Sequence, residues 1–227
     1  MPIIEDEELG RITVRRTSGS SMRASMAPNG TLRVAVPRYA PMFMVRRMIA
    51  SSRPNLRKVL DSKPRLILHD GMEVGKSHRL HIRRGQSFSV RRQGLQLTVT
   101  LGPDDSSDDR EVIESVRSHI HAVLRKEAKA HLPKRIEYLA KTHGFDYTSL
   151  RFTHASSRWG SCNSKKTISL NIALMSLPFE LIDYVLIHEL AHTVQLNHSK
   201  DFWQEVARAD PNYLKHRRSL KQHNPAV

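Results

Sequence analysis

His188 and His192 are four residues apart in the segment His188-Glu189-Leu190-Ala191-His192. In an α-helix this spacing turns the chain through about 400° and advances it about 6 Å, so both imidazoles lie on one face. Two imidazoles at that distance can chelate one metal ion. Glu189, at the edge of the same face, could take a proton from a metal-bound water without binding the metal itself. The spacing therefore predicts a metal centre with a general base beside it.

A third ligand is expected, because catalytic zinc sites use three protein ligands and keep one position for water. His198 follows His192 by six residues, which in a continuous helix would rotate it by about 240° and carry it about 9 Å away. We therefore expect the helix to stop and the chain to turn back, with Asn197 in a left-handed conformation and Ser199 capping the next helix. Three neutral imidazoles with an open position suit Zn²⁺, which is the predicted metal.

Chance does not explain this pattern well. A His-Glu-x-x-His segment arises by chance in about 3 to 4% of chains of this composition, and a third histidine at one fixed position lowers that to about 0.2%. The alternatives are buried helix histidines satisfied by hydrogen bonds, or a purely structural zinc. A structural site would more often be closed by a fourth His or Cys, and Cys162, the single cysteine, is better explained as a small buried thiol.

The elements that must position these residues follow from the apolar spacing. A helix is expected from Ser176 as N-cap toward Gln195, and it is apolar on most of its sides. A long helix is expected from Glu111 to Gly144, and strands are expected at 149–153 and 167–172. The sequence thus predicts a buried helix that offers one chelating face.

The first hundred residues show mostly the alternation typical of strands, including a hairpin across Pro28-Asn29-Gly30. The segment 102–109 has no apolar residue, which suggests a domain boundary. We therefore expect an α+β protein with a basic β-rich N-terminal domain, residues 1–109, followed by a catalytic domain, residues 110–227, that carries the histidine motif. No internal repeat is evident in the sequence.

The charge balance bears on partners. Lys and Arg number 37 against 22 Asp and Glu, which gives a net charge of +15 with neutral His. This excess favours nucleic acid or another polyanion as a partner, although a solvated basic surface explains it as well. The N-terminus is acidic where a secretory signal would be basic, and no apolar run of about 18 residues occurs, so a cytoplasmic protein without a membrane segment is expected.

The sequence resembles one known family, the YgjP-like zincin-type metallopeptidases. The resemblance covers most of the chain and is carried by the following segments: Arg158-Trp159-Gly160-Ser161-Cys162, Ile168-Ser169-Leu170-Asn171, Asp183-Tyr184-Val185, the His188 to His192 motif, Asn197-His198-Ser199, Phe202-Trp203 and Pro211-Asn212-Tyr213. It implies a zincin-like catalytic half with His188, His192 and His198 on zinc and Glu189 as general base. The family is described mainly as metal-dependent hydrolases, so the resemblance says little about substrate.

Two other zincin groups fit less well. The metzincin pattern shares the His198 spacing but has Gly at the position of Gln195 and a Met-containing turn downstream, whereas no Met follows Met175 here. The SprT-like DNA-dependent proteases combine a similar helix with basic character, but the segment 158–162 and the short loop to His198 look like the YgjP-like group. Coupling to DNA stays open.

Several neighbouring residues are candidates for further roles. Arg158 and Asn171 flank or lie on the strand that borders the cleft in zincin-like folds, and either could bind substrate or a developing oxyanion. Tyr184 and Tyr213 are weaker candidates for an oxyanion donor, and Glu205 could hydrogen-bond a ligand imidazole.

These features together predict a zinc-dependent hydrolase, most simply a metallopeptidase that cleaves amide bonds of peptide or protein substrates with Glu189 as general base. One alternative is a hydrolase of an anionic non-peptide substrate such as a nucleotide, which the positive charge favours. The other is a nucleic-acid-associated module in which zinc is structural.

Overall fold

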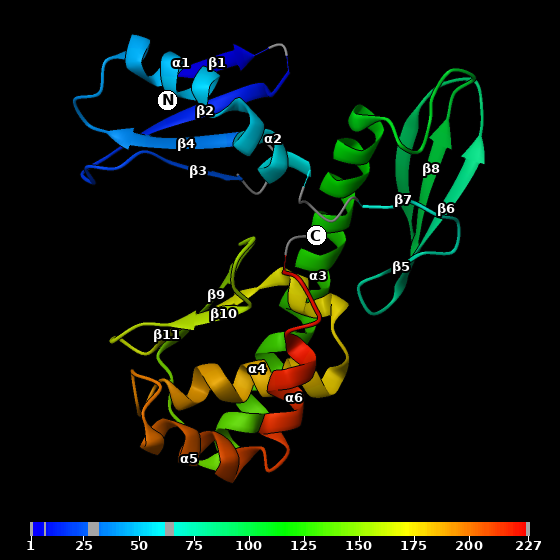
Figure 1. The fold of residues 1–227 in the computed structure, drawn as a ribbon. Helices are drawn as coiled ribbons and strands as arrows, with labels where there is room; N and C mark the ends of the chain where they lie inside the picture. Colours follow the sequence, from blue (N-terminus) through cyan, green and yellow to red (C-terminus); the bar gives the residue numbers. More distant parts are fainter. Residues whose placement is uncertain (1, 7, 27–31, 62–65, 226–227) are drawn as a thin grey trace. The chain divides into compact units, whose positions relative to one another are not determined.

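The computed structural model describes residues 2–6, 8–26, 32–61 and 66–225. The chain forms two compact units, Met1–Arg65 and Leu66–Val227. Helices and mixed sheets occur together, which confirms the predicted α+β class (Figure 1). A bilayer span would need a long apolar helix, and the described residues contain none.

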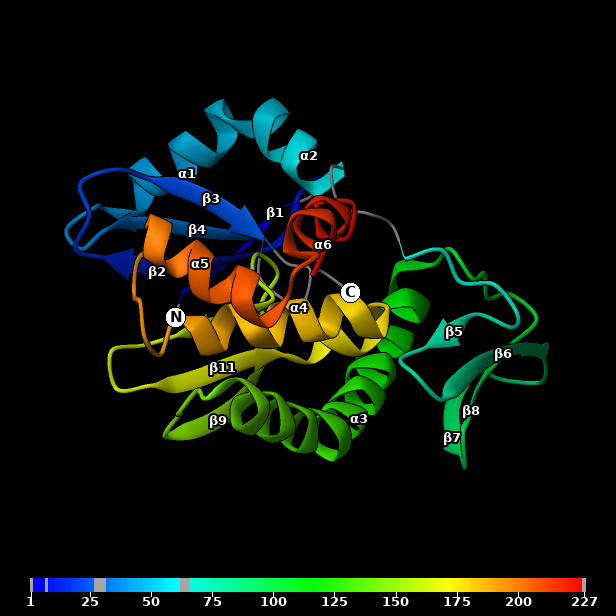
Figure 2. The same cartoon turned by 90° about the horizontal axis from the view of Figure 1, so that it is seen from below.

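The first unit is a four-stranded sheet with two helices over one face (Figure 2). Its elements are β1 (Ile3–Asp6), β2 (Gly10–Thr17), β3 (Arg23–Met26), β4 (Leu32–Pro37), α1 (Met42–Ser51) and α2 (Arg53–Asp61). The strand order is β1-β2-β4-β3, in which the central pair is parallel and both outer pairs are antiparallel.

Alternation of side chains makes this sheet one-sided. Ile12 and Val14 on β2 pair with Leu32 and Val34 on β4, and all four side chains are fully buried. Helix α1 adds Val45 to the same core, as its amphipathic spacing requires. The antiparallel pairing of β3 with β4 confirms the predicted hairpin, although Pro28-Asn29-Gly30 lies outside the described residues.

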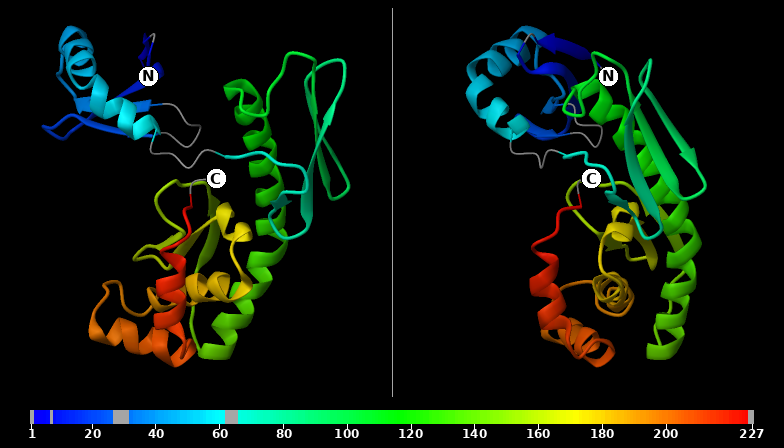
Figure 3. Two further views of the ribbon diagram at one scale, coloured as in Figure 1. Left: turned by 45° about the vertical axis from the view of Figure 1, so that its right-hand side comes forward. Right: turned by 90° about the vertical axis from the view of Figure 1, so that its right-hand side faces the viewer.

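The second unit begins with another four-stranded sheet and a long helix. Its first elements are β5 (Glu73–Val74), β6 (His78–Arg84), β7 (Ser89–Gln93), β8 (Gln96–Leu101) and α3 (Arg110–His143). Helix α3 has 34 residues, so it extends about 50 Å. The sheet packs against one end of α3, and the remaining elements of the unit gather along its other end (Figure 3).

The remaining elements form a small sheet and a group of helices. They are β9 (Ser149–Thr153), β10 (Gly160–Cys162), β11 (Thr167–Asn171), a 3-10 helix η1 (Ile172–Ser176), α4 (Phe179–Ala191), α5 (Lys200–Ala209) and α6 (Tyr213–Leu220). The strand order is β10-β11-β9, so β10 is an edge strand. One continuous hydrophobic cluster joins the second four-stranded sheet, α3 and these elements.

The two four-stranded sheets repeat one design. The strand orders β1-β2-β4-β3 and β5-β6-β8-β7 carry the same pattern of parallel and antiparallel pairs. The registers also correspond, since Ile12 faces Leu32 in the first sheet and Leu80 faces Leu97 in the second. We call β1–β4 and β5–β8 the first and second sheet modules.

An arginine performs the same task in both sheet modules. Arg16, at the end of β2, donates to the carbonyls of Arg38 and Ala40 in the loop before α1. Arg84, at the same register position of β6, donates to the carbonyls of Gly102 and Asp105 in the loop before α3. The internal repeat that the sequence does not make evident is therefore present in the structure.

The domain boundary expected in the segment 102–109 is not where the structure divides. The boundary follows Arg65, and 102–109 is a surface loop that joins β8 to α3 within one unit. Arg84 and the Asp105 carboxylate, which accepts from the Gly102 N–H at 2.7 Å, hold this loop. Its polar composition reflects turns and the start of a helix, which composition alone cannot distinguish from a linker.

A buried carboxylate connects the second sheet module to α3. Glu127, 5% exposed, accepts hydrogen bonds from the N–H of Lys76 at 2.6 Å, the N–H of Ser77 at 3.0 Å and Nδ1 of His78 at 2.8 Å. Gly75 passes so close that an added Cβ would lie 2.1 Å from Oε2 of Glu127. The tight turn between β5 and β6 is thus built around this side chain.

Replacing Glu127 with Gln is expected to destabilise the protein by about 1–3 kcal/mol, because one acceptor oxygen is lost where three donors converge. The readout is the midpoint of urea unfolding. Glu137→Gln, on an exposed site of the same helix, serves as control and is expected to change stability by less than about 0.5 kcal/mol. Equal stability of the two variants would contradict the assignment.

Candidate metal centre

Helix α4 carries the predicted motif and is almost wholly buried. Its buried positions include Leu186, Leu190 and Ala191, each 0% exposed. The helix begins at Phe179 after Pro178, because Ser176 belongs to the preceding 3-10 helix. The N-cap predicted at Ser176 is therefore wrong, while the helical placement of the motif is confirmed.

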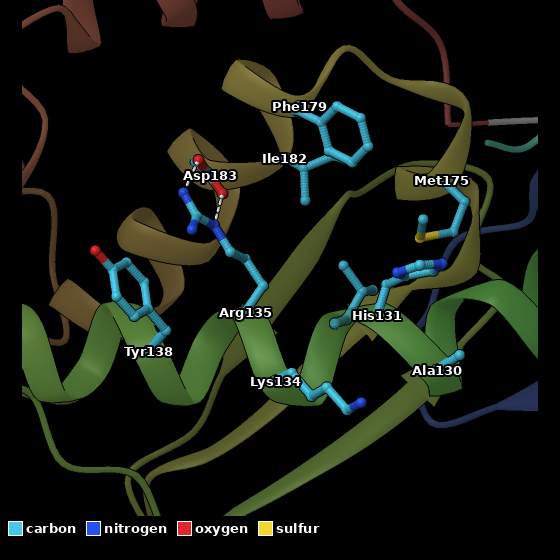
Figure 4. Close-up of a pocket in the computed structure, with 10 residues that line it drawn as sticks. Ala130, His131, Lys134, Arg135, Tyr138, Met175, Phe179, Ile182 and Asp183 are labelled. Carbon is cyan, nitrogen blue, oxygen red and sulfur yellow. Dashed lines mark hydrogen bonds and ion pairs between the residues drawn. The ribbon is translucent and has the colours of Figure 1, made fainter.

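An ion pair anchors α4 to α3. Arg135 donates from Nε and Nη2 to the two carboxylate oxygens of Asp183 at 2.7 and 2.6 Å, and this pairing raises the pKa of the guanidinium. The pair lies at the edge of a groove between the two helices (Figure 4). The groove lining includes His131, Tyr138 and Phe179 but none of the three motif histidines, so this groove is separate from the metal centre.

The chain reverses immediately after the motif. Helix α4 ends at Ala191 rather than near Gln195, and a series of turns follows before α5 begins. Ser199 caps α5 by accepting from the Phe202 N–H at 3.3 Å, as predicted. Asn197 is not in a left-handed conformation, so the predicted helix cap at that residue is wrong.

This reversal brings the three histidines together. One ligand nitrogen from each of His188, His192 and His198 lies within 4.8 Å of the others. The two Nε2 atoms of His188 and His198 are 3.2 Å apart. Ligand atoms at the corners of a tetrahedral zinc site, with bonds of about 2.0–2.1 Å, are separated by about 3.3–3.4 Å. The histidines therefore fit a metal ion with three imidazole ligands, and no other group of three or more His, Cys, Asp or Glu converges in this way among the described residues.

A backbone carbonyl fixes the ring orientation of His192. The backbone carbonyl of Gln195 lies 3.0 Å from Nδ1 of His192 and can only accept a hydrogen bond. The proton of the neutral ring is therefore placed on Nδ1, which leaves the lone pair of Nε2 for a metal. Nδ1 of His188 is also buried but has no hydrogen-bond partner among the described residues.

Aromatic rings support the imidazoles. Phe202, 0% exposed, contacts all three histidine rings with centroid distances of 4.9, 4.4 and 4.8 Å to His188, His192 and His198. Trp203 stacks on His198 at 5.7 Å. Helix α5 thus holds the third ligand in place through packing.

The surroundings favour the neutral form of His188 and His192. Burial is the largest cause that lowers the pKa of His188, to about 3, and the charges of His192, His198 and Arg217 lower it further. Burial and His198 also lower the pKa of His192, against the effect of the Gln195 carbonyl. Neutral imidazole is the form that binds a metal.

Glu189 lies buried against the edge strand of the small sheet. The residue is 5% exposed, and its Oε2 atom makes no hydrogen bond among the described residues. A Cβ added at Gly160 on β10 would lie 2.6 Å from Oε1 of Glu189, so only glycine allows this close approach. Burial raises the pKa of Glu189 to about 8, and the positive charge of Arg158 acts in the opposite direction.

Arg158 and Asn171, the two candidates for substrate or oxyanion binding, lie in different surroundings. Arg158 is exposed in the loop before β10, and its charge acts on Glu189, so it stays a candidate for substrate binding. Asn171 is 0% exposed, and its amide donates to the carbonyls of Ala155 and Arg158 and accepts from the Ala173 N–H. Its side chain therefore holds a loop and caps η1, and this structural role accounts for its burial.

The structure also shows the contacts of the three remaining candidates, Tyr184, Tyr213 and Glu205. The Tyr184 ring lies 6.1 Å from that of His188, and burial raises the pKa of its phenol to about 12. Tyr213 stacks on Trp203 rather than on a ligand. Glu205 pairs with Arg208 at 2.7 Å, which differs from the expected contact with a ligand imidazole.

Sequence reasoning missed two features of this region. Gly160 lies in the segment 158–162 that carries part of the family resemblance, but the sequence does not indicate its close approach to Glu189. His216 on α6 is tied through Nδ1 to Asp210 at 2.7 Å, and its ring lies 6.3 Å from Tyr184. The spacing of six residues between Asp210 and His216 spans the start of α6 and gave no helical signal.

Comparison with known proteins identifies similarity to metallopeptidases. A family model described as YgjP-like, metallopeptidase domain, matches residues 20–223. Among solved structures, the crystal structure of the metallopeptidase zymogen of Pyrococcus abyssi abylysin is 27% identical, with a TM-score of 0.36 over 40% of this chain and 92% of that chain. No curated protein matches the chain.

The family model spans the first sheet module from residue 20 onward, the second sheet module and every residue of the metal centre. This coverage confirms the resemblance carried by the sequence motifs. The chain therefore belongs to the YgjP-like family and contains its metallopeptidase domain.

Proposed function

We propose that the protein is a zinc-dependent peptidase in which His188, His192 and His198 hold the ion and Glu189 is the general base. The observation that supports this most directly is the convergence of three imidazoles next to a buried carboxylate. A bound Zn²⁺ would supply Lewis-acid polarisation of a carbonyl and would lower the pKa of a water molecule.

Glu189 would transfer a proton from the attacking water to the leaving nitrogen. Its pKa of about 8 without a metal reflects burial, and a cation held by the neighbouring histidines would favour the ionised carboxylate. The carboxylate would take one proton from the attacking water as the water oxygen bonds to the amide carbon. It would then pass this proton to the leaving nitrogen as the C–N bond breaks.

The edge strand β10 favours an extended peptide as substrate. Among the strands that the structure describes, β10 pairs with β11 alone, so its other edge is available for strand pairing. Gly160 on this strand contacts Glu189, which places the strand next to the proposed base. An extended substrate could add to the edge through backbone hydrogen bonds, which would position a peptide bond without demanding particular side chains.

Arg158 would act on the substrate rather than on the metal. It is exposed at the start of β10 and carries the positive charge that acts on Glu189. In the proposed reaction its guanidinium would bind a substrate carbonyl or carboxylate close to the base.

Replacing Glu189 with Gln is expected to leave zinc bound and to lower peptide hydrolysis by at least about 100-fold, because the amide cannot accept the proton. Zinc is measured by elemental analysis, and turnover with unfolded proteins, a peptide library and nucleoside triphosphates. Glu180→Gln, exposed on the same helix, is the control. Full peptide hydrolysis by the Glu189 variant would refute the mechanism, and Glu189-dependent phosphate release alone would assign a nucleotide substrate.

Replacing His198 with Ala is expected to weaken zinc binding by more than about 100-fold, since even the loss of an outer partner of a ligand costs 10- to 100-fold. Competition against a chromogenic chelator measures the affinity. His131→Ala, on an exposed site of α3, should bind zinc like the native chain. An unchanged affinity in the His198 variant would remove this residue from the ligand set.

Replacing Gly160 with Ala is expected to lower peptide hydrolysis about 10-fold or more with zinc still bound, because the new methyl group displaces the Glu189 carboxylate. Gly19→Ala is a matched control, since an added Cβ there meets only Thr17 Oγ1 at 3.8 Å. Native turnover in the Gly160 variant would show that the close packing of Glu189 does not matter for catalysis.

A further inference from the structure

The open face of the first sheet module is rich in arginine. Since Ile12 and Val14 of β2 point into the core, the intervening residues of this strand lie on the opposite face. The strand registers place residues of β1, β3 and β4 on that face beside them. The charged members of this face are Glu5, Arg11, Arg15, Arg23 and Arg33.

The second sheet module presents the same chemistry. Leu80 of β6 is fully buried in the core that the sheet shares with α3, so its neighbours Arg79 and His81 and the following Arg83 lie on the opposite face. The register adds residues of β5, β7 and β8 to this face. Its charged or titratable members are Glu73, Arg79, His81, Arg83 and Arg91.

Equivalent positions of the two modules carry the same residues. Arg11 and Arg79 each pair across the strand with one glutamate, Glu5 and Glu73 respectively, and Arg15 and Arg83 come four residues later. The described parts of the two faces together hold seven arginines, two glutamates and no lysine: Arg11, Arg15, Arg23, Arg33, Arg79, Arg83 and Arg91 against Glu5 and Glu73.

We propose that these two faces bind the phosphodiester backbone of nucleic acid. The planar fork of arginine matches phosphate oxygens in pairs, which a lysine ammonium cannot do. Four residues along a strand and two strand spacings separate charges by about 13 and 10 Å, so each face can meet several phosphates of one strand or duplex.

The faces are built for backbone contact without base readout. Their described members include no Phe, Tyr or Trp side chain on which bases could stack, and His81 is the single imidazole among them. Their neutral members are mostly small or polar, such as Thr13, Ala35 and Thr98, and Ile3 at an edge strand is the large apolar exception. A surface that inserts into lipid would need more apolar residues, so nucleic acid is favoured over an anionic membrane.

Fluorescence anisotropy with labelled duplex and single-stranded 25-mers tests the proposal on the full chain between 50 and 200 mM salt. Binding at micromolar concentrations is expected, with an affinity that falls steeply as salt increases. Replacing three arginines of one face with Gln should weaken binding about 10-fold or more and flatten the salt slope by about 2 to 3. The triple variants are Arg11, Arg15 and Arg23 to Gln, and Arg79, Arg83 and Arg91 to Gln.

Matched controls remove the same charge elsewhere. In the first unit, Arg46, Arg47 and Arg57 lie exposed on α1 and α2, and on α3 the exposed residues Lys126, Lys129 and Lys134 serve the same purpose. Native-like binding by these controls would support the assignment. Three results would overturn it: no binding at 150 mM salt, equal losses in the controls, or losses confined to binding of anionic phosphatidylserine vesicles.

Discussion

The metal centre depends on one change of direction in the backbone, the end of α4 at Ala191. Continued helix would carry His198 about 9 Å along the axis and away from the chelating face, so no third imidazole could reach the first two. Packing fixes the reversal. Phe202 is fully buried and contacts all three imidazoles, which ties the start of α5 to the last turn of α4. The ligand nitrogens are therefore brought together by hydrophobic contacts that do not require a metal. This preorganisation reduces the conformational entropy that the side chains would lose on binding a metal.

Burial of Glu189 next to the three histidines has a free-energy cost. A carboxylate 5% exposed and close to Gly160 is costly to ionise, and its raised pKa expresses this cost. A cation at the three histidines would offset it. The protein thus accepts a locally unfavourable group at the position where the proposed mechanism places a base, next to the edge strand. Arg158, exposed in the loop before that strand, supplies a positive charge that acts on the carboxylate in the opposite direction.

The sequence predicted those parts of the site that follow from fixed helical geometry. A spacing of four places His188 and His192 on one face wherever the helix lies, and the need for a third ligand then required a turn before His198. The sequence could not predict roles that depend on which polar side-chain atoms have no hydrogen-bond partner in the folded protein. Asn171 looks available at a strand end, but both of its amide hydrogens are donated to backbone carbonyls and its oxygen accepts from the Ala173 N–H. The segment 102–109 has the composition of a linker, and only the shared core of β8 and α3 shows that it is a loop within one unit.

The repeat of the sheet module explains why the chain divides where it does. In the first sheet module the apolar face is covered by the short helices α1 and α2, so its core is closed by Leu56 and separate from the rest. In the second sheet module the same face is covered by the N-terminal half of α3, whose C-terminal half packs against η1 and α4. The 34-residue length of α3 is what joins a sheet module to the catalytic elements in one hydrophobic core. Since the helices cover the apolar face in both copies, the opposite, arginine-bearing face of each sheet is the one left for contacts outside its own module.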